Sequence, residues 1–79
     1  MKFHHIGVAS KDGAAVVKNF QNLGAQFDGK VFSDPTPRVY IRFVNLGDLR
    51  YEIVSPMDGE SAVWPFLKRR IFLRDTFLL

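Results

Sequence analysis

Apolar and polar residues alternate along two stretches in the middle of the chain, residues 38–46 and 49–55. This two-residue period, combined with many β-branched and aromatic side chains, predicts two β-strands. Gly47 and Asp48 lie between the stretches and are typical turn residues, so the pair predicts a β-hairpin. Residues 2–9 show a similar pattern and predict a first strand of the sheet.

The period changes to that of a helix after the first strand. Three apolar residues recur at the i, i+4 and i+7 spacing of one helical stripe: Val16, Phe20 and Leu23. Ser10 or Asp12 can cap the start of this helix, because either side chain can accept a hydrogen bond from an amide of the first turn. Gly24 stands where a left-handed residue ends many helices. The pattern therefore predicts a helix over about 12–23.

The remaining elements are shorter. Residues 25–34 predict a weaker strand, and the prolines that follow predict a turn. Residues 61–70 predict a short second helix. Pro65 would clash with a carbonyl four residues back in a helix that begins at Ala62, so the alternative is a helix that begins at Trp64–Pro65, with Pro65 near its first position. The order is β-α-β-β-β, which indicates an α+β fold with a mixed sheet and a helix on one face. We expect one domain over 1–69, closed by the second helix, and an apolar tail over 70–79.

The size and composition of the chain restrict its class. A domain of 79 residues hides only roughly 60–65% of its unfolded surface, so stability is marginal. The sequence has no cysteine, which excludes disulfides and thiolate metal sites and favours a reducing compartment. No signal peptide and no apolar run of about 18 residues is visible, so we expect a cytoplasmic protein without a membrane segment.

The net charge of +3 comes largely from four basic residues near the end: Lys68, Arg69, Arg70 and Arg74. Basic and acidic residues nearly balance elsewhere. A nucleic-acid surface needs a broad basic face, so we expect no nucleic-acid partner and interpret the cluster as a solvated helix end. An anionic substrate is the alternative partner for these side chains.

Strand alternation collects polar side chains on one face of the sheet: His5, Tyr40, Arg42, Arg50 and Glu52. The other face is apolar and suits the helical stripe. A three-residue loop over 46–48 would place Arg42 directly opposite Glu52. This face can simply meet water, with Arg42 and Glu52 forming an ion pair worth about a few tenths of a kcal/mol, or it can form a site.

Three stretches together resemble the vicinal-oxygen-chelate superfamily, which includes glyoxalase I, extradiol dioxygenases, bleomycin-resistance proteins and methylmalonyl-CoA epimerase. They are FHHIGVASKD, RVYIRFVNLGDLRYEIVSP and SPMDGESAVWPFLKR. The last is similar to the loop and helix that close the first module of methylmalonyl-CoA epimerase-like members. The resemblance implies a βαβββ module and covers residues 1–69.

The resemblance also implies roles for individual residues. Metal-using members take a histidine from the first strand and a glutamate or glutamine from the fourth, positions that fall on His5 and Glu52. These would bind Zn, Ni, Co or Mn, and Glu52 would also exchange protons with a small oxygen-bearing substrate. Tyr40, Arg42 and Arg50 would line the cup and orient an anionic group of that substrate.

The chain departs from the superfamily in one respect. Members usually carry two modules, and the second supplies two further ligands, whereas this sequence contains one. We therefore expect a homodimer in which two copies of His5 and Glu52 complete the metal site of an isomerase, epimerase or lyase. Two alternatives stay open: a metal-free module that binds a small molecule, and a truncated module without activity.

Overall fold

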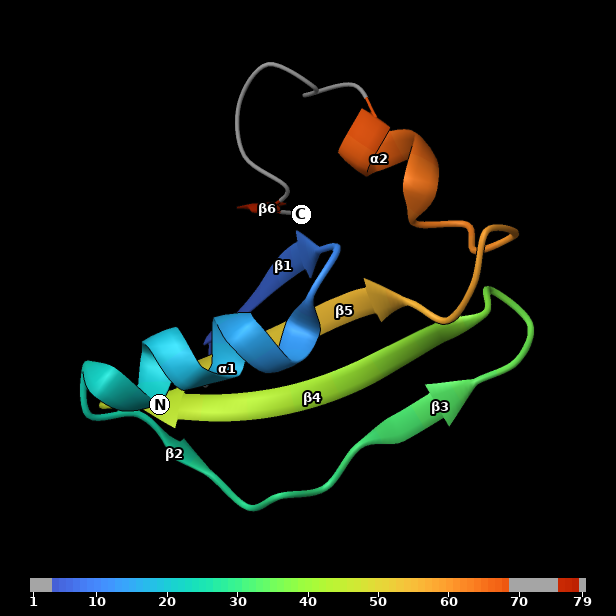
Figure 1. The fold of residues 1–79 in the computed structure, drawn as a ribbon. Coiled ribbons are helices and arrows are strands. Elements are labelled where there is room, and N and C mark those ends of the chain that lie inside the picture. The colour runs from blue at the N-terminus through green and yellow to red at the C-terminus, as the bar shows by residue number, and fades with distance from the viewer. Residues whose placement is uncertain (1–3, 69–75, 79) are drawn as a thin grey trace.

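The structure is a computed structural model that describes residues 4–68 and 76–78. In chain order the elements are β1 His4–Ser10, α1 Gly13–Asn22, β2 Gln26–Phe27, β3 Phe32–Asp34, β4 Val39–Leu46, β5 Leu49–Pro56, α2 Trp64–Lys68 and β6 Thr76–Leu78. The strands form one mixed sheet in the order β2-β4-β5-β1-β6, and β3 also pairs with β4. Helix α1 lies along the sheet and α2 lies beyond the end of β5 (Figure 1). The predicted α+β class and the βαβββ core are confirmed.

Both ends of α1 follow from local hydrogen bonding. Asp12 is the N-cap, and its carboxylate accepts a hydrogen bond from the amide of Ala15 at 3.1 Å. At the other end Gly24 adopts a φ of +100° and donates to the carbonyl of Gln21 at 2.9 Å. The amide of Ala25 donates to the carbonyl of Phe20 at 3.0 Å, which completes a Schellman motif.

Two layers of apolar side chains pack on opposite faces of the sheet. The layer under α1 contains Val8, Val16, Val17, Ala25, Val44 and Ile53, with Phe20, Phe27, Leu46 and Tyr51 packed against it. The layer on the opposite face contains Ala9, Val39, Val63 and Leu67, with Ile41, Val54 and Trp64 around them, and α2 covers this end of the sheet. One part of the helical stripe was predicted wrongly: Leu23 is 71% exposed, because α1 ends at Asn22 and the chain turns away at Gly24.

The predicted weak strand over 25–34 is two separate strands. Phe27 pairs with Val44 and Phe32 pairs with Ile41. Four residues, 28–31, therefore stand opposite only two residues of β4, and the chain between β2 and β3 bows away from the sheet. We call residues 28–31 the bow; it is visible in Figure 1 between the two short strands.

The β4–β5 hairpin has a two-residue turn, not the three-residue loop that we expected. Leu46 pairs with Leu49, and Gly47 in the turn has a φ of +62°. A change of one residue in register moves every side chain of a strand to the other face. Arg42 consequently pairs with Ile53 on the face covered by α1, and its predicted position opposite Glu52 was wrong.

Part of the predicted tail belongs to the sheet. Thr76–Leu78 form β6 and pair antiparallel with the free edge of β1. The other residues of the tail, together with Arg69, lie outside the described residues. No helix within the described part of the chain has the length and apolar character needed to cross a membrane.

Candidate functional site

The face of the sheet opposite α1 carries the candidate site. Strands β1 and β5 run parallel, with His5 in register with Arg50 and Gly7 in register with Glu52. Because residues in register share a face and alternate residues return to it, positions 5, 50 and 52 occupy one face of two adjacent strands. The Glu52 side chain is half-buried. For His5 the structure describes the backbone position only.

Tyr40 and Arg42 lie on the opposite face from these positions, so the predicted gathering of all five polar residues was wrong. Tyr40 pairs with Ser55 and is 36% exposed. Arg42 is half-buried under the start of α1, where its Nη1 donates to Ser55 Oγ at 3.2 Å. The sheet itself therefore separates both residues from Arg50 and Glu52.

Phe43 occupies the place that we expected Arg42 to take, directly opposite Glu52. The Arg50 guanidinium carbon lies 4.4 Å from the centre of the Phe43 ring, within the range of a cation–π contact. The Phe32 ring meets Phe43 edge-on with 6.0 Å between centroids. The sequence signal for this arrangement is the Gly47-Asp48 pair, which is typical of a two-residue turn and hence of this register.

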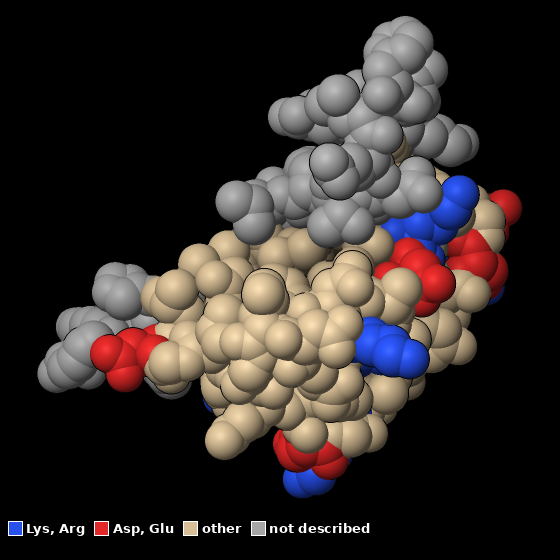
Figure 2. All heavy atoms as spheres, turned by 60° about the vertical axis from the view of Figure 1, so that its left-hand side comes forward, with Lys and Arg blue, Asp and Glu red and all other residues tan. Residues whose placement is uncertain are grey.

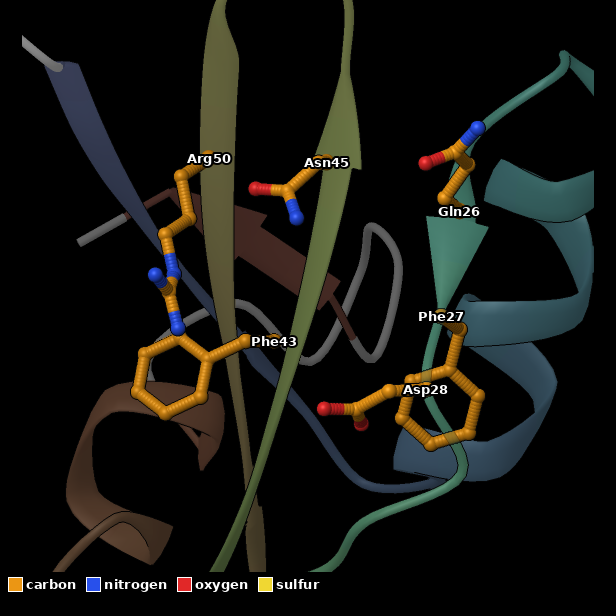
Figure 3. Close-up of a pocket in the computed structure, with 6 residues that line it drawn as sticks. All are labelled: Gln26, Phe27, Asp28, Phe43, Asn45 and Arg50. Carbon is orange, nitrogen blue, oxygen red and sulfur yellow. The ribbon is translucent and has the colours of Figure 1, made fainter.

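A hollow of about 250 Å³ opens beside Arg50 on the same face. Figure 3 shows its lining, in which side chains from β2, the bow, β4 and β5 converge: Gln26, Phe27, Asp28, Phe43, Asn45 and Arg50. Sequence reasoning singled out only Arg50 of this set. The others were missed because the pairing of β2 with β4 brings Gln26 and Asp28 to this hollow, and no local sequence pattern predicts that pairing.

Arg50 has an unusual environment within the hollow. Its side chain is half-buried, and its Nε is buried with no hydrogen-bond partner among the described residues. A buried donor without a partner is uncommon in a folded protein, because desolvation of the group is then uncompensated. The Phe43 ring packs against one side of the guanidinium. Among the described residues, no acidic side chain forms an ion pair with Arg50.

A second polar feature fixes the loop between β5 and α2. Arg38 and Asp58 form a two-pronged ion pair with an Arg38 Nη2 to Asp58 Oδ2 distance of 2.9 Å. Its hydrogen bonds lower the pKa of the Asp58 carboxyl, with the Glu60 amide as second donor, and raise the pKa of Arg38. The Trp64 indole donates to the Asp58 carbonyl at 2.7 Å, so this loop orients the start of α2.

Charged side chains are distributed without a dominant sign on the side of the molecule shown in Figure 2, where both signs surround an uncharged middle. Within residues 4–68 and 76–78, no three His, Cys, Asp or Glu side chains come together as a metal site would require.

Comparison with known proteins relates the fold to solved structures. No protein-family model matches the sequence, and no curated protein matches it significantly. A hypothetical protein from Bacillus halodurans C-125 superposes with a TM-score of 0.74 and 27% identity, over 87% of this chain and 50% of that chain. Methylmalonyl-CoA epimerase from Mycobacterium tuberculosis gives 0.77 and 15% identity, over 95% of this chain and 49% of that chain.

A third structure is methylmalonyl-CoA epimerase from Streptomyces coelicolor in complex with 2-nitronate-propionyl-CoA. It gives a TM-score of 0.73 and 19% identity, over 89% of this chain and 53% of that chain. The chain thus has the glyoxalase-like fold that the resemblance predicted, and its structural neighbours include epimerases. It spans about half the length of each of these structures.

Proposed function

We propose that the chain is a metal-dependent isomerase, epimerase or lyase that acts as a homodimer on a small oxygen-bearing substrate. The observation that supports this proposal best is the parallel register of β1 and β5, in which positions 5 and 52 share the face opposite α1. The fold is that of the epimerases described above. A substrate linked to coenzyme A belongs to the same proposal.

His5 and Glu52 are the right types of ligand for a divalent ion, but one chain supplies too few of them. An imidazole and a carboxylate suit Zn, Ni, Co or Mn, and such sites use three or four protein ligands. His5 and Glu52 of one chain supply two. A second copy facing the first across this side of the sheet would supply two more, and the matched epimerase chain is about twice as long as this one, since the match covers 49% of it.

The chemistry follows from which groups share this face. A bound metal would polarise two neighbouring oxygens of the substrate and stabilise the negative charge formed when the adjacent carbon loses its proton. Glu52 exchanges that proton as a general base or acid. Arg50, two residues away on the same face, orients an anionic group of the substrate. Tyr40 and Arg42 have no part in this proposal, because they lie behind the sheet.

A metal-free binding module of the same fold is the second candidate. The observation that favours it is the hollow beside Arg50, which is formed by side chains of a single chain and needs no metal.

Metal content and sedimentation separate these candidates. Purified protein reconstituted with Zn²⁺ is expected to sediment as a dimer and hold about one ion per two chains, using four shared ligands. His5→Ala and Glu52→Gln are expected to lose the ion. Glu60→Gln, which changes an exposed carboxylate in the loop before α2, is the matched control and keeps it. Unchanged metal content in His5→Ala, or a strictly monomeric protein, would contradict the proposal.

A further inference from the structure

The hollow beside Arg50 exists because of a mismatch in strand pairing. The bow places four residues opposite Arg42 and Phe43 of β4, so the chain stands away from the sheet there. Gly29 in the bow has a φ of +85°, a conformation that favours glycine. The Phe43 ring forms one wall of a space that the chain itself does not fill.

The Arg50 side chain extends from β5 into this space, and its guanidinium is preorganised by packing on Phe43. The Phe43 ring fixes its guanidinium at 4.4 Å, and the buried Nε has no partner among the described residues. A guanidinium offers several N–H donors in one plane, a geometry that matches the two oxygens of a carboxylate. An anionic ligand in the hollow would therefore accept hydrogen bonds from the Arg50 guanidinium, which lines the hollow and forms no ion pair with a described residue.

Asp28 reaches the same space from the opposite side. Its Oδ1 accepts a hydrogen bond from the Lys30 amide at 2.9 Å, and Oδ2 accepts no hydrogen bond from a described residue. Figure 3 shows the Asp28 carboxylate directed into the hollow from the β2 side, with Arg50 extending over Phe43 from β5. The amides of Gln26 and Asn45 lie along one side and supply both donors and acceptors.

We propose that this hollow binds a small zwitterion, with its carboxylate on Arg50 and its ammonium group on Asp28. The charges at the two sides are opposite, and the ligand that matches both is one with a negative and a positive end. A dicarboxylate would place its second negative charge against Asp28, and a simple monocarboxylate would gain no interaction with Asp28. The volume restricts the ligand to a small molecule.

The inference deepens the proposed function and depends on it for the reaction, because the zwitterion would be the class of substrate held at Arg50, two residues from Glu52 on the same strand. Binding itself depends only on the hollow. The two statements can therefore fail separately.

The test uses three probes of similar length: 4-aminobutyrate, butyrate and glutarate. Each is titrated into ¹⁵N-labelled protein, and the signals followed are the Arg50 Nε–H and the side-chain amides of Gln26 and Asn45. We expect 4-aminobutyrate to shift all three groups and to bind at least about fivefold more tightly than glutarate or butyrate.

Two variants assign the ends of the ligand. Arg50→Gln is expected to abolish binding of 4-aminobutyrate. Asp28→Asn is expected to weaken 4-aminobutyrate about threefold to tenfold, a moderate factor because Asp28 is exposed, and to strengthen glutarate relative to it. Asp34→Asn is the matched control, since its carboxylate accepts from the Thr36 amide at 3.2 Å in the same kind of turn but outside the hollow.

The outcomes are distinct. Equal binding of 4-aminobutyrate and glutarate, or an unchanged preference in Asp28→Asn, overturns the zwitterion assignment. Repeating the titration on Zn²⁺-loaded protein separates the two proposals. If the protein binds Zn²⁺ but 4-aminobutyrate shifts none of the three signals, only the zwitterion proposal is contradicted. Ligand binding by a protein that takes up no metal supports the inference and contradicts the metal-dependent function.

Discussion

Arg42 Nη1 donates a hydrogen bond to Ser55 Oγ at 3.2 Å, under the first residue of α1. That residue, Gly13, is buried, and a Cβ at its position would lie 2.6 Å from Arg42 Nη1 and 2.9 Å from Ser55 Oγ. The close approach of the helix start to the sheet therefore depends on glycine. The register of β4 and β5 puts Arg42 on this face of the sheet, away from Arg50.

Gly13→Ala is expected to destabilise the protein by about 1–2 kcal/mol, because the new methyl group displaces the Arg42 guanidinium and strains the contact with Ser55. The measurement is the free energy of unfolding in urea. The control is Gly59→Ala, where a Cβ would meet nothing within 4 Å. The variant Gly13→Ala/Arg42→Ala is expected to show a smaller added cost of the methyl group. Equal stability of the two single glycine variants would contradict this account.

The sequence predicted the elements well because each has a local signal. The helical stripe, the Asp12 cap and the left-handed Gly24 specify α1, and the alternation of β4 and β5 specifies two strands. The register between β4 and β5 is harder to predict from local sequence, because it depends on whether the turn contains two residues or three. That single residue exchanges Arg42 for Phe43 opposite Glu52 and so changes the composition of the whole face.

The hollow could not be read from the sequence for a related reason. Its lining depends on where β2 leaves β4 and β3 rejoins it, and the β2–β4 pairing joins residues far apart in the chain, Gln26 with Asn45 and Phe27 with Val44. Of the predicted site, Glu52 and Arg50 do share one face, and the register of β1 adds position 5 to it. The roles of these three residues remain predictions.

Variants of Ile53 and Leu23 can show by their stability where the apolar layer under α1 ends. Ile53 is fully buried, whereas Leu23 is 71% exposed beyond the last turn of the helix. Ile53→Val is expected to cost about 0.5–1.5 kcal/mol of unfolding free energy, because it removes one buried methyl group. Leu23→Ala removes more atoms and is expected to cost less than about 0.5 kcal/mol. A larger loss for Leu23→Ala in urea unfolding would show that its side chain is covered in solution.

The backbone of Arg38 offers a separate test of strain. Arg38 has a φ of +59°, which is unfavourable for a residue with a Cβ, and its carbonyl accepts from the Met57 amide at 2.9 Å. Arg38→Ala and Arg38→Gly both remove the ion pair with Asp58 and differ mainly in this backbone cost. The alanine variant is therefore expected to be less stable than the glycine variant by about 1 kcal/mol. Equal urea midpoints would show that the turn relaxes without the ion pair.

The Arg38–Asp58 pair also predicts a dependence of stability on pH. The hydrogen bonds from Arg38 and from the Glu60 amide lower the pKa of Asp58 in the folded protein below its ordinary value of 3.8. Unfolding then binds protons, so the pair stabilises the protein above pH 3.8 and this contribution is lost as the pH falls through the lower folded pKa. Both side chains are solvent-exposed, so the effect is small and is measured as a difference between variants.

Wild-type and Asp58→Asn proteins are compared by urea unfolding between pH 7 and pH 2. The stability advantage of the wild type is expected to be constant near neutral pH and to shrink below about pH 4, where Asp58 of the unfolded chain begins to be protonated while Asp58 of the folded protein is still ionised. Glu60→Gln is the control, because it alters a neighbouring exposed carboxylate but keeps the backbone amide that bonds to Asp58. An advantage that stays the same down to pH 2 would mean that the pair contributes nothing through ionisation of Asp58.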